Sequence, residues 1–256
     1  MKLGIVTYQL GKDWDVPTLI EKLTALKYQG VELRTSHAHG VEDSLNKAQR
    51  AEVRRRFAES SVEVVGLGST FEYHSMDPRV VRDNVEGTKR YCELAKDIGA
   101  QGVKVRPNGH NEDKGVPREQ TLDQIGRALL ECGHAAADNG VQIRLEMHAS
   151  VGDAVDMRRV IDVADHPNVW LCWNSNARFD VDEHGSVRKD FDLVKDKIGL
   201  VHLHDLTDEA YPWSELLHLL KDNGYQGYCL AECAPPSPDP ERVLQYFRAL
   251  YYAYGG

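Results

Sequence analysis

The sequence predicts a single (β/α)8 (TIM) barrel, in which eight parallel strands close into a barrel surrounded by helices, as one domain covering residues 1–256. The length of 256 residues matches the roughly 250 typical of this fold. Short apolar segments rich in β-branched residues recur eight times, and the intervals between them show helical periodicity. Strands that alternate with helices form parallel sheets, and eight such repeats favour closure into a barrel.

The predicted strands start about 27 to 40 residues apart, roughly the length of one βαβ unit. In chain order they are LGIVTY from Leu3, VELRT from Val31, VEVVGL from Val62, VKVRP from Val103, VQIRLEMH from Val141, VWLCWNSN from Val169, LVHLHD from Leu200 and YCLAEC from Tyr228. An open doubly wound sheet is the main alternative. It is disfavoured because no glycine-rich phosphate turn follows the first strand.

Helical periodicity is clearest in two of the intervals. One segment with apolar residues at helical spacing ends at Gly140, and another runs from Val81 to Gly99; glycine favours helix C-termini. The proline-rich segment 235–240 predicts the last loop of the barrel, before a helix that starts at Glu241.

The composition argues against several kinds of partner. The chain carries 31 Lys and Arg against 40 Asp and Glu, and a net charge of -9 repels nucleic-acid backbones. Its five cysteines include no CxxC pair, so we expect neither a disulfide framework nor a thiolate zinc site, which fits a reducing cytosol. No signal peptide and no long apolar run is apparent in the sequence. We therefore expect a cytoplasmic protein that binds neither nucleic acid nor membrane.

Polar side chains share one face on six of the predicted strands. Successive residues of a barrel strand point by turns toward the axis and toward the helices. Residues of the other parity, such as Val31 and Leu33, are apolar and suit packing against helices. The inward polar set crowds the carboxyl halves of the strands, where barrel enzymes carry their chemistry. It consists of Glu32, Arg34, Lys104, Arg106, Arg144, Glu146, His148, Asn174, Asn176, His202, His204 and Glu232.

This inward set has two interpretations. The first is structural ion pairs inside the barrel, such as Glu32 with Arg34 or Arg144 with Glu146. Burying several charges costs on the order of several kcal/mol for each unpaired group, however, and Glu146 and Glu232 have few evident local partners. Two carboxylates, an imidazole and an amide oxygen that converge on one point suit Mn2+, Mg2+, Co2+ or Zn2+. A divalent metal is therefore the second interpretation.

A metal at this point would support proton transfer on a sugar. The ion would polarise a carbonyl and the neighbouring hydroxyl, and it would stabilise the enediolate formed when a carboxylate removes the proton beside that carbonyl. Glu146 and Glu232, from the fifth and eighth strands, would act as base and acid on opposite faces of the carbon. These two residues are the predicted catalytic pair.

Further candidates for substrate binding surround the same mouth. His37 and His39 follow the second strand, in a loop that either lines the mouth or is merely solvated. Lys104 and Arg106 either contact a phosphate or a sugar hydroxyl or pair with barrel carboxylates, and bidentate anion recognition favours Arg106. The predicted substrate-binding residues are His37, His39, Lys104, Arg106, His148 and His204.

The chain resembles the sugar phosphate isomerase/epimerase family, the xylose isomerase-like TIM barrels that also include endonuclease IV, inosose dehydratases and ketose 3-epimerases. The resemblance covers nearly the whole chain. It is carried by GVELRTSHAHG (30–40), RLEMHAS (144–150), LCWNSNARFD (171–180), VHLHD (201–205) and GYCLAEC (227–233). It implies a metal held by Glu146, Asn174, His202 and Glu232.

The chain departs from the family pattern at two strands. Where the family often has Asp and, three residues later, His on the sixth strand, this chain has Asn174 and Ala177. The amide oxygen of Asn174 remains a ligand, but one negative charge is lost. On the seventh strand, His204 stands where a lysine is common.

Three functions remain open at this stage. The first is a metal-dependent isomerase or epimerase of a sugar, sugar phosphate or polyol. The second is a dehydratase of an inosose-like or dehydroshikimate-like substrate, and the third is a sugar-binding barrel without turnover, which the loss of charge at Asn174 favours. An endonuclease IV-like activity is disfavoured by the missing histidine and the acidic charge. We also expect a homodimer, because the apolar C-terminal tail exceeds what one helix must bury; it contains Tyr246, Phe247, Leu250, Tyr251, Tyr252 and Tyr254.

Overall fold

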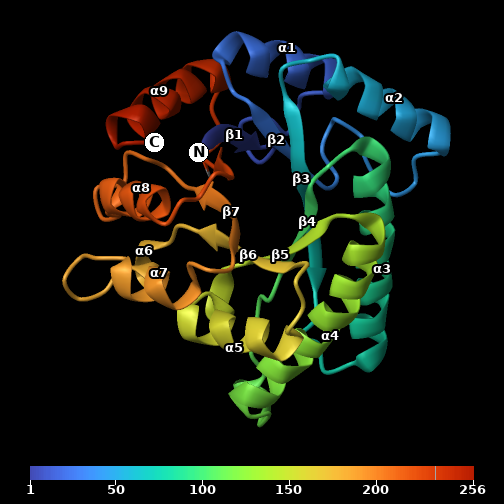
Figure 1. The fold of residues 1–256 in the computed structure, drawn as a ribbon, viewed down its shortest axis with the longest axis vertical. Helices are drawn as coiled ribbons and strands as arrows, with labels where there is room; N and C mark the ends of the chain where they lie inside the picture. The colour runs from blue at the N-terminus through green and yellow to red at the C-terminus, as the bar shows by residue number, and fades with distance from the viewer. Residues whose placement is uncertain (234) are drawn as a thin grey trace.

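Eight parallel strands form a closed barrel, in which each strand pairs with the next and β8 pairs with β1. The computed structural model describes residues 1–233 and 235–256. Its strands are β1 (Lys2–Val6), β2 (Gly30–Arg34), β3 (Glu63–Glu72), β4 (Gly102–Arg106), β5 (Gln142–Glu146), β6 (Val169–Asn174), β7 (Ile198–Leu203) and β8 (Tyr228–Ala231). The predicted (β/α)8 barrel is confirmed (Figure 1).

Helices follow the strands and surround the barrel (Figure 1). They are α1 (Val16–Leu26), α2 (Lys47–Ala58), α3 (Pro78–Ile98), α4 (Arg118–Asn139), α5 (Ala154–Ala164), α6 (Ala177–Asp180), α7 (Arg188–Val194), α8 (Trp213–Asp222) and α9 (Pro240–Ala253). Gly140 ends α4 in the left-handed conformation, with φ of 67°, as predicted. The predicted last helix is confirmed as α9, which starts one residue earlier, at Pro240.

Every strand except β3 leaves the barrel ladder earlier than the sequence pattern predicts. Each of β5, β6, β7 and β8 ends two residues before its predicted end; β5, for example, ends at Glu146 instead of His148. The backbone turns outward at these points to form the loops of the mouth. The last polar residue of each pattern, such as His148 or His204, therefore lies on a loop and not on a strand.

The barrel interior has two layers. One cluster of inward side chains, which we call the apolar layer, consists of Val6, Val65, Cys172, Leu200, Tyr228 and Leu230. His202 and Glu232 lie two residues after Leu200 and Leu230, so they point inward from the same strands. Together with the other inward charged groups they form a polar layer toward the carboxyl ends of the strands. Residues of the opposite parity, such as Trp173, are buried against the helices, as predicted.

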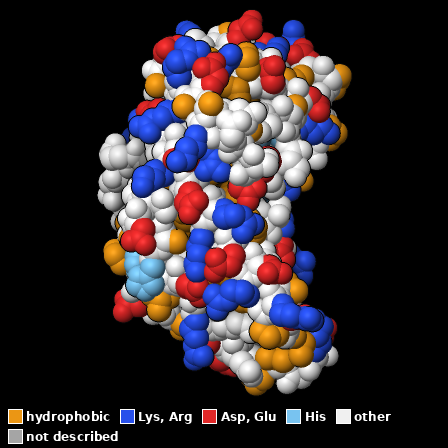
Figure 2. All heavy atoms as spheres, turned by 90° about the vertical axis from the view of Figure 1, so that its right-hand side faces the viewer, with side chains coloured by type: hydrophobic (Ala, Val, Ile, Leu, Met, Phe, Trp, Pro, Cys, Tyr) orange, Lys and Arg blue, Asp and Glu red, His pale blue; other side chains and the backbone are white. Residues whose placement is uncertain are grey.

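The outer face of α2, α3 and α4 carries charges of both signs, interspersed (Figure 2). Arg50 of α2 pairs with Asp97 of α3 at 2.9 Å, and Glu131 of α4 pairs with Arg82 and Lys89 of α3 at 2.6 and 2.7 Å. Each exposed ion pair contributes little to stability. This mixture is typical of a solvated surface.

The C-terminal helix α9 packs against the barrel wall. Phe247 and Tyr251 are buried, whereas Tyr246 and Tyr252 are 60% and 50% exposed. Part of the apolar tail from which we predict a homodimer is therefore covered within the chain.

No helix in the described residues is long and apolar enough to cross a membrane. The five cysteines are free and buried.

Candidate active site

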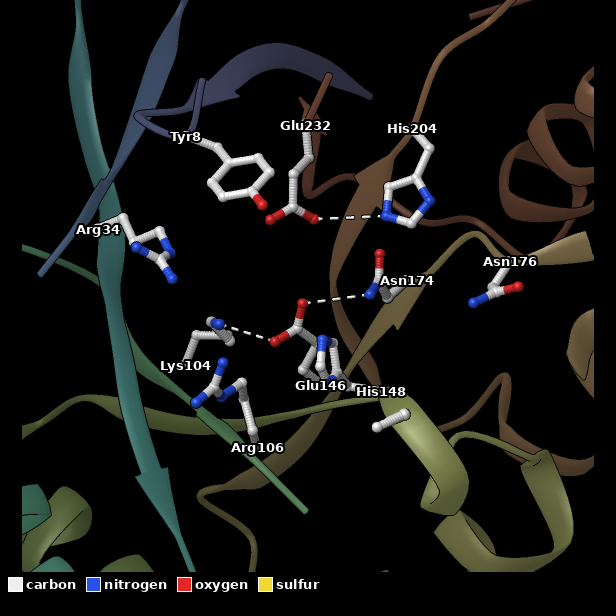
Figure 3. Close-up of a pocket in the computed structure, with 11 residues that line it drawn as sticks. Tyr8, Arg34, Lys104, Arg106, Glu146, His148, Asn174, Asn176, His204 and Glu232 are labelled. Atoms are coloured by element: carbon white, nitrogen blue, oxygen red, sulfur yellow. Dashed lines mark hydrogen bonds and ion pairs between the residues drawn. The ribbon is translucent and has the colours of Figure 1, made fainter. Parts of the chain in front are cut away.

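A cavity of about 360 Å³ opens at the carboxyl ends of the strands. Its lining comes from the strand ends and the loops that follow them, which is the location of catalytic sites in barrels of this type. The lining residues are Tyr8, Arg34, Lys104, Arg106, Glu146, His148, Ala149, Asn174, Asn176, His204 and Glu232 (Figure 3). The structure thus brings most of the predicted inward set to one cavity.

Three of the predicted ligand side chains converge at the base of this cavity. Glu146, His202 and Glu232 each offer an atom within 4.8 Å of the other two. Nδ1 of His202 lies 3.1 Å from Oε2 of Glu232 and 3.5 Å from Oε1 of Glu146. The sequence pattern predicted this convergence, because the three residues share the inward parity and lie at the carboxyl ends of β5, β7 and β8.

His202 is held in orientation by a carboxylate on its other side. Its Nε2 lies 3.4 Å from Oε2 of Glu32, and the ring is completely buried. Burial alone would lower the pKa of His202, but Cys172 and the surrounding carboxylates raise that pKa well above its ordinary value. A carboxylate behind a histidine fixes the direction of its other nitrogen, as is usual for metal-binding histidines. Nδ1 is therefore directed at the two glutamates of the site.

Asn174 supplies an oxygen that the protein leaves without a partner. Its Nδ2 donates to Oε1 of Glu146 at 3.2 Å, whereas its Oδ1 is buried and has no hydrogen-bond partner within the described residues. A buried polar atom without a partner costs free energy unless a ligand satisfies it. Two carboxylates, an imidazole nitrogen and this free amide oxygen are donors that suit a divalent cation. The residues present therefore fit the predicted metal.

A buried ion pair joins Lys104 to Glu146. Nζ of Lys104 lies 2.7 Å from Oε2 of Glu146, and both side chains are almost fully buried. Burial alone would raise the pKa of Glu146, but Lys104 and His202 lower it to about 2. Burial would likewise lower the pKa of Lys104, but the barrel carboxylates raise it. Both groups are charged at neutral pH, and the alternative that Lys104 pairs with a barrel carboxylate is confirmed.

The other ion pairs considered for the barrel interior are wrong. Arg144 does not pair with Glu146; its guanidinium donates to the backbone oxygen of Val65 at 3.0 Å and to the side chain of Gln142 at 3.0 Å. Arg34 does not reach Glu32, because it sits at the end of its strand and faces the mouth. Alternate residues of one strand lie on different levels of the barrel, and this separation favours partners on neighbouring strands.

Arg106 pairs with a carboxylate that the sequence did not connect to it. Its guanidinium donates to Glu72, at the end of β3, which also accepts a hydrogen bond from Asn108. β3 is longer than predicted and extends to Glu72, so this carboxylate reaches the end of β4. Arg106 nevertheless lines the cavity, where contact with substrate remains a prediction.

His148 and His204 lie on the cavity wall as predicted. Nδ1 of His148 is 2.6 Å from Oδ1 of Asn108. Burial lowers the pKa of His148, so the ring is neutral at pH 7 and donates to Asn108 through Nδ1. Nε2 of His204 lies 3.6 Å from Oε2 of Glu232 (Figure 3). One histidine thus stands on each side of the two glutamates.

His37 and His39 are not among the residues that line the cavity. His39 is buried and uses both ring nitrogens within its own loop: Nε2 donates to the backbone oxygen of Arg34 at 2.8 Å, and Nδ1 accepts from the backbone nitrogen of Val41 at 3.0 Å. His37 lies behind Arg34, 3.4 Å from its guanidinium. Both rings therefore shape the loop after β2 instead of facing the cavity.

Three polar residues of the cavity wall were not predicted as site residues: Tyr8, Arg34 and Asn176. Tyr8 lies two residues beyond the inward Val6, and its ring faces the guanidinium of Arg34 at 5.3 Å. Asn176 lies two residues beyond Asn174 and caps α6. Arg34 and Asn176 already belong to the predicted inward set but were given no role, and Tyr8 has the same parity as Val6 within the predicted first strand.

A (β/α)8 barrel whose mouth gathers carboxylates around a buried histidine defines a class of barrel proteins with a candidate metal centre. Within that class, the chain belongs to the xylose isomerase-like TIM barrel family, because the model of this family matches residues 20–250. The resemblance predicted from the sequence motifs is confirmed. No curated protein is a significant match to this sequence.

Several solved structures share the fold of this chain. A 3-keto-D-glucoside 4-epimerase from E. coli superposes with a TM-score of 0.81 at 16% identity, covering 99% of both chains. A D-psicose 3-epimerase with D-tagatose from Clostridium cellulolyticum H10 also has a TM-score of 0.81, at 15% identity and 99% coverage of both chains. The IolI protein with a bound zinc atom has a TM-score of 0.76 at 16% identity, covering 99% of this chain and 98% of its own. At these identities the likeness establishes the fold.

Proposed function

We propose that this protein is a divalent-metal-dependent isomerase or epimerase of a sugar or sugar derivative, which moves a proton beside a carbonyl group. The observation that carries the proposal is the convergence of Glu146, His202 and Glu232 within 4.8 Å at the base of the cavity. The epimerases among the structural neighbours, and the zinc atom in the IolI structure, support this choice. The metal ligands would be Glu146, Asn174, His202 and Glu232.

A divalent ion bound there would polarise the carbonyl and hydroxyl oxygens of the substrate. The protein groups around the site hold its ligands in place. Lys104 and Asn174 fix the carboxylate of Glu146 through contacts of 2.7 and 3.2 Å, and Glu32 fixes the ring of His202. Such contacts around the ligands hold the donor atoms before substrate arrives.

Glu146 and Glu232 would move the proton. Both have a lowered pKa, because the surrounding cations and His202 outweigh the effect of burial, so both are ionised and able to accept a proton. Epimerisation needs a proton removed from one face of a carbon and returned to the other face, and therefore uses both carboxylates. Isomerisation returns the proton to the neighbouring carbon and needs only one of them. Lys104 and His204 would offset the negative charge that develops on the substrate oxygens.

Two alternatives share the same site. In a dehydratase, removal of the same proton would be followed by loss of a hydroxyl group from the next carbon. A sugar-binding barrel without turnover is favoured by a specific observation: Lys104 neutralises one ligand, and Asn174 is neutral where the family often has Asp. Water loss from the substrate would identify the first, and binding without proton exchange would identify the second.

The test combines metal content with proton exchange. Wild type, Glu146→Gln and Glu232→Gln are purified, incubated with Mn2+ and measured by elemental mass spectrometry, with Glu21→Gln, an exposed residue of α1, as control. We expect about one ion per chain in wild type and control and much less in the two site variants. Wild type should also incorporate deuterium from D2O into a bound ketose. No retained metal in wild type would overturn metal dependence.

The homodimer and the cytoplasmic location remain predictions. Tyr246 and Tyr252 are the exposed aromatic residues of α9, and a dimer that uses this face would bury them. Sedimentation equilibrium of wild type and of a Tyr246→Ser, Tyr252→Ser variant would test the dimer. A monomer at micromolar concentration would contradict it.

A further inference from the structure

The cations that line the cavity lie on one wall. Arg34 ends β2, and Lys104 and Arg106 belong to β4; in Figure 3 these three side chains lie on the same side of Glu146 and Glu232. The opposite side carries the amide of Asn176 and the imidazole of His204. We call Arg34, Lys104 and Arg106 the cationic wall.

Arg34 differs from the other two members of the cationic wall. Lys104 pairs with Glu146, and Arg106 pairs with Glu72. In the part of the chain that the structure describes, no carboxylate lies within ion-pair distance of Arg34. One full positive charge on the cavity wall therefore lacks a counter-charge from the protein.

The guanidinium of Arg34 is held from behind by neutral groups. Burial and the nearby Arg34 lower the pKa of His37, so that ring is neutral at pH 7. Its Nε2 can then accept from Arg34, 3.4 Å away, and its Nδ1 can donate to the hydroxyl of Thr7 at 3.3 Å. The guanidinium lies over the ring of Tyr8, with Cζ 5.3 Å from the ring centroid. These contacts fix the position of the charge without cancelling it.

One positive charge on the cavity lining has no carboxylate partner within the described residues. Lys104 is paired with Glu146 and Arg106 with Glu72, whereas among those residues Arg34 has no carboxylate within ion-pair distance. A divalent ion at the predicted site would add further positive charge. A neutral sugar would displace water from Arg34 and offer only hydroxyl acceptors, which leave its charge uncompensated, whereas an anionic ligand would supply a counter-charge. Arg106 lines the same cavity and its side chain is 21% exposed, so a second guanidinium is available there.

We propose that the substrate carries an anionic group, a carboxylate or a phosphate, which binds to Arg34 and Arg106 on the cationic wall while its carbonyl end faces Glu146 and Glu232. This inference rests on the proposed function, because it assigns the substrate class of the same site. His37 is then a positioning residue that acts through Arg34. The shared requirement is a planar or tetrahedral oxyanion that accepts from guanidinium groups.

Three probes with one carbon skeleton separate charge from shape: D-fructose, D-fructose 6-phosphate and D-fructuronate. Their binding to the Mn2+-treated protein is measured by titration calorimetry. We expect at least one anionic probe to bind roughly tenfold or more tightly than D-fructose. Added salt should weaken only the anionic probes. A preference for D-fructose 6-phosphate indicates a phosphate, and a preference for D-fructuronate indicates a carboxylate.

Arg34→Met should remove most of the anion preference, and Arg34→Lys should retain part of it. Arg56→Met, in the last turn of α2 at the far end of the barrel, removes the same charge and should leave all three affinities unchanged. Equal affinities of wild type for the three probes would overturn the anionic-substrate proposal, and this comparison decides even if Arg34→Met is unstable. A preference that persists in folded Arg34→Met would overturn the assignment to Arg34.

These measurements separate the two proposals, because binding requires no turnover. Anion preference without deuterium exchange would leave the anionic ligand standing and overturn the isomerase or epimerase. Deuterium exchange into D-fructose with no anion preference would support the isomerase or epimerase and overturn the anionic ligand.

Discussion

The two layers of the barrel interior are built from successive inward residues of the same strands, yet burial has opposite consequences in them. Leu200 and Leu230 of the apolar layer are completely buried among hydrocarbon groups, which stabilises the fold. Two residues further along, His202 is completely buried and the side chain of Glu232 is 12% exposed, and both have charged neighbours. Burial there costs free energy unless each charge has a partner. A barrel can therefore keep its stability in one layer and hold chemically active groups in the next.

Removal of the Lys104 charge should lower the free energy of unfolding more than any other change considered. It tests whether buried charges in the polar layer depend on their partners. In Lys104→Met the buried carboxylate of Glu146 loses its partner, so the free energy of unfolding without metal should fall by about 3–5 kcal/mol. Mn2+ should restore part of this loss, because a cation that binds the folded state stabilises it. Urea unfolding with and without Mn2+ measures both effects. The exposed Lys47→Met serves as control, and an identical loss with and without Mn2+ would contradict a metal site at Glu146.

A cavity in the apolar layer should cost about as much or somewhat less, and metal should not restore it. Leu230 is completely buried, so Leu230→Ala should lower the free energy of unfolding by about 2–5 kcal/mol. Leu193→Ala, at a residue that is 39% exposed, should change it by less than about 0.5 kcal/mol. Because the side chain of Leu230 is hydrocarbon and binds no ion, the loss should be the same with Mn2+. Restoration by Mn2+ would show that the two layers are coupled.

A smaller effect on stability is expected from Asp180, a buried carboxyl group at the end of α6. Asp180 accepts hydrogen bonds from the backbone nitrogen of Asn176 at 2.6 Å and from the hydroxyl of Tyr211 at 3.0 Å. Burial raises the pKa of Asp180 from 3.8 to about 7. The folded state therefore retains a proton that the unfolded state has released, and stability is lost as the pH rises from about 4 through 7.

Asp180→Asn should remove that loss. The free energy of unfolding of the variant, minus that of wild type, should rise between pH 4 and pH 8 by on the order of 1–3 kcal/mol. Urea unfolding across this pH range measures the difference. A difference that does not change with pH would show that Asp180 is ionised throughout.

The sequence was sufficient to predict where the strands lie and in which direction their side chains point. Alternation along the strands separated Glu146, His202 and Glu232 from apolar neighbours such as Trp173, because a closed barrel leaves each side chain only two directions. The same alternation placed Asn176 in the inward set, and applied to the predicted first strand it would also have identified Tyr8.

The sequence was insufficient to predict the conformation of the loops that follow the strands. His37 and His39 follow β2 with the spacing of mouth residues, but their hydrogen bonds to Thr7, Arg34 and Val41 turn both rings into the loop. Loop conformation depends on such contacts between segments, and no periodicity encodes them. Ion-pair partners were uncertain for a related reason, because Arg106 meets Glu72 only through the longer course of β3.

The reaction of the buried cysteines with alkylating reagents can be used to measure how often this barrel opens. Cys172 and Cys229 are completely buried, and burial raises the pKa of their thiols to about 11 and about 12. Alkylating reagents attack the thiolate, so the closed barrel offers them neither access nor the reactive form of these residues. Since Cys172 belongs to the apolar layer, its rate of alkylation measures how often the strands separate, with no probe added to the chain.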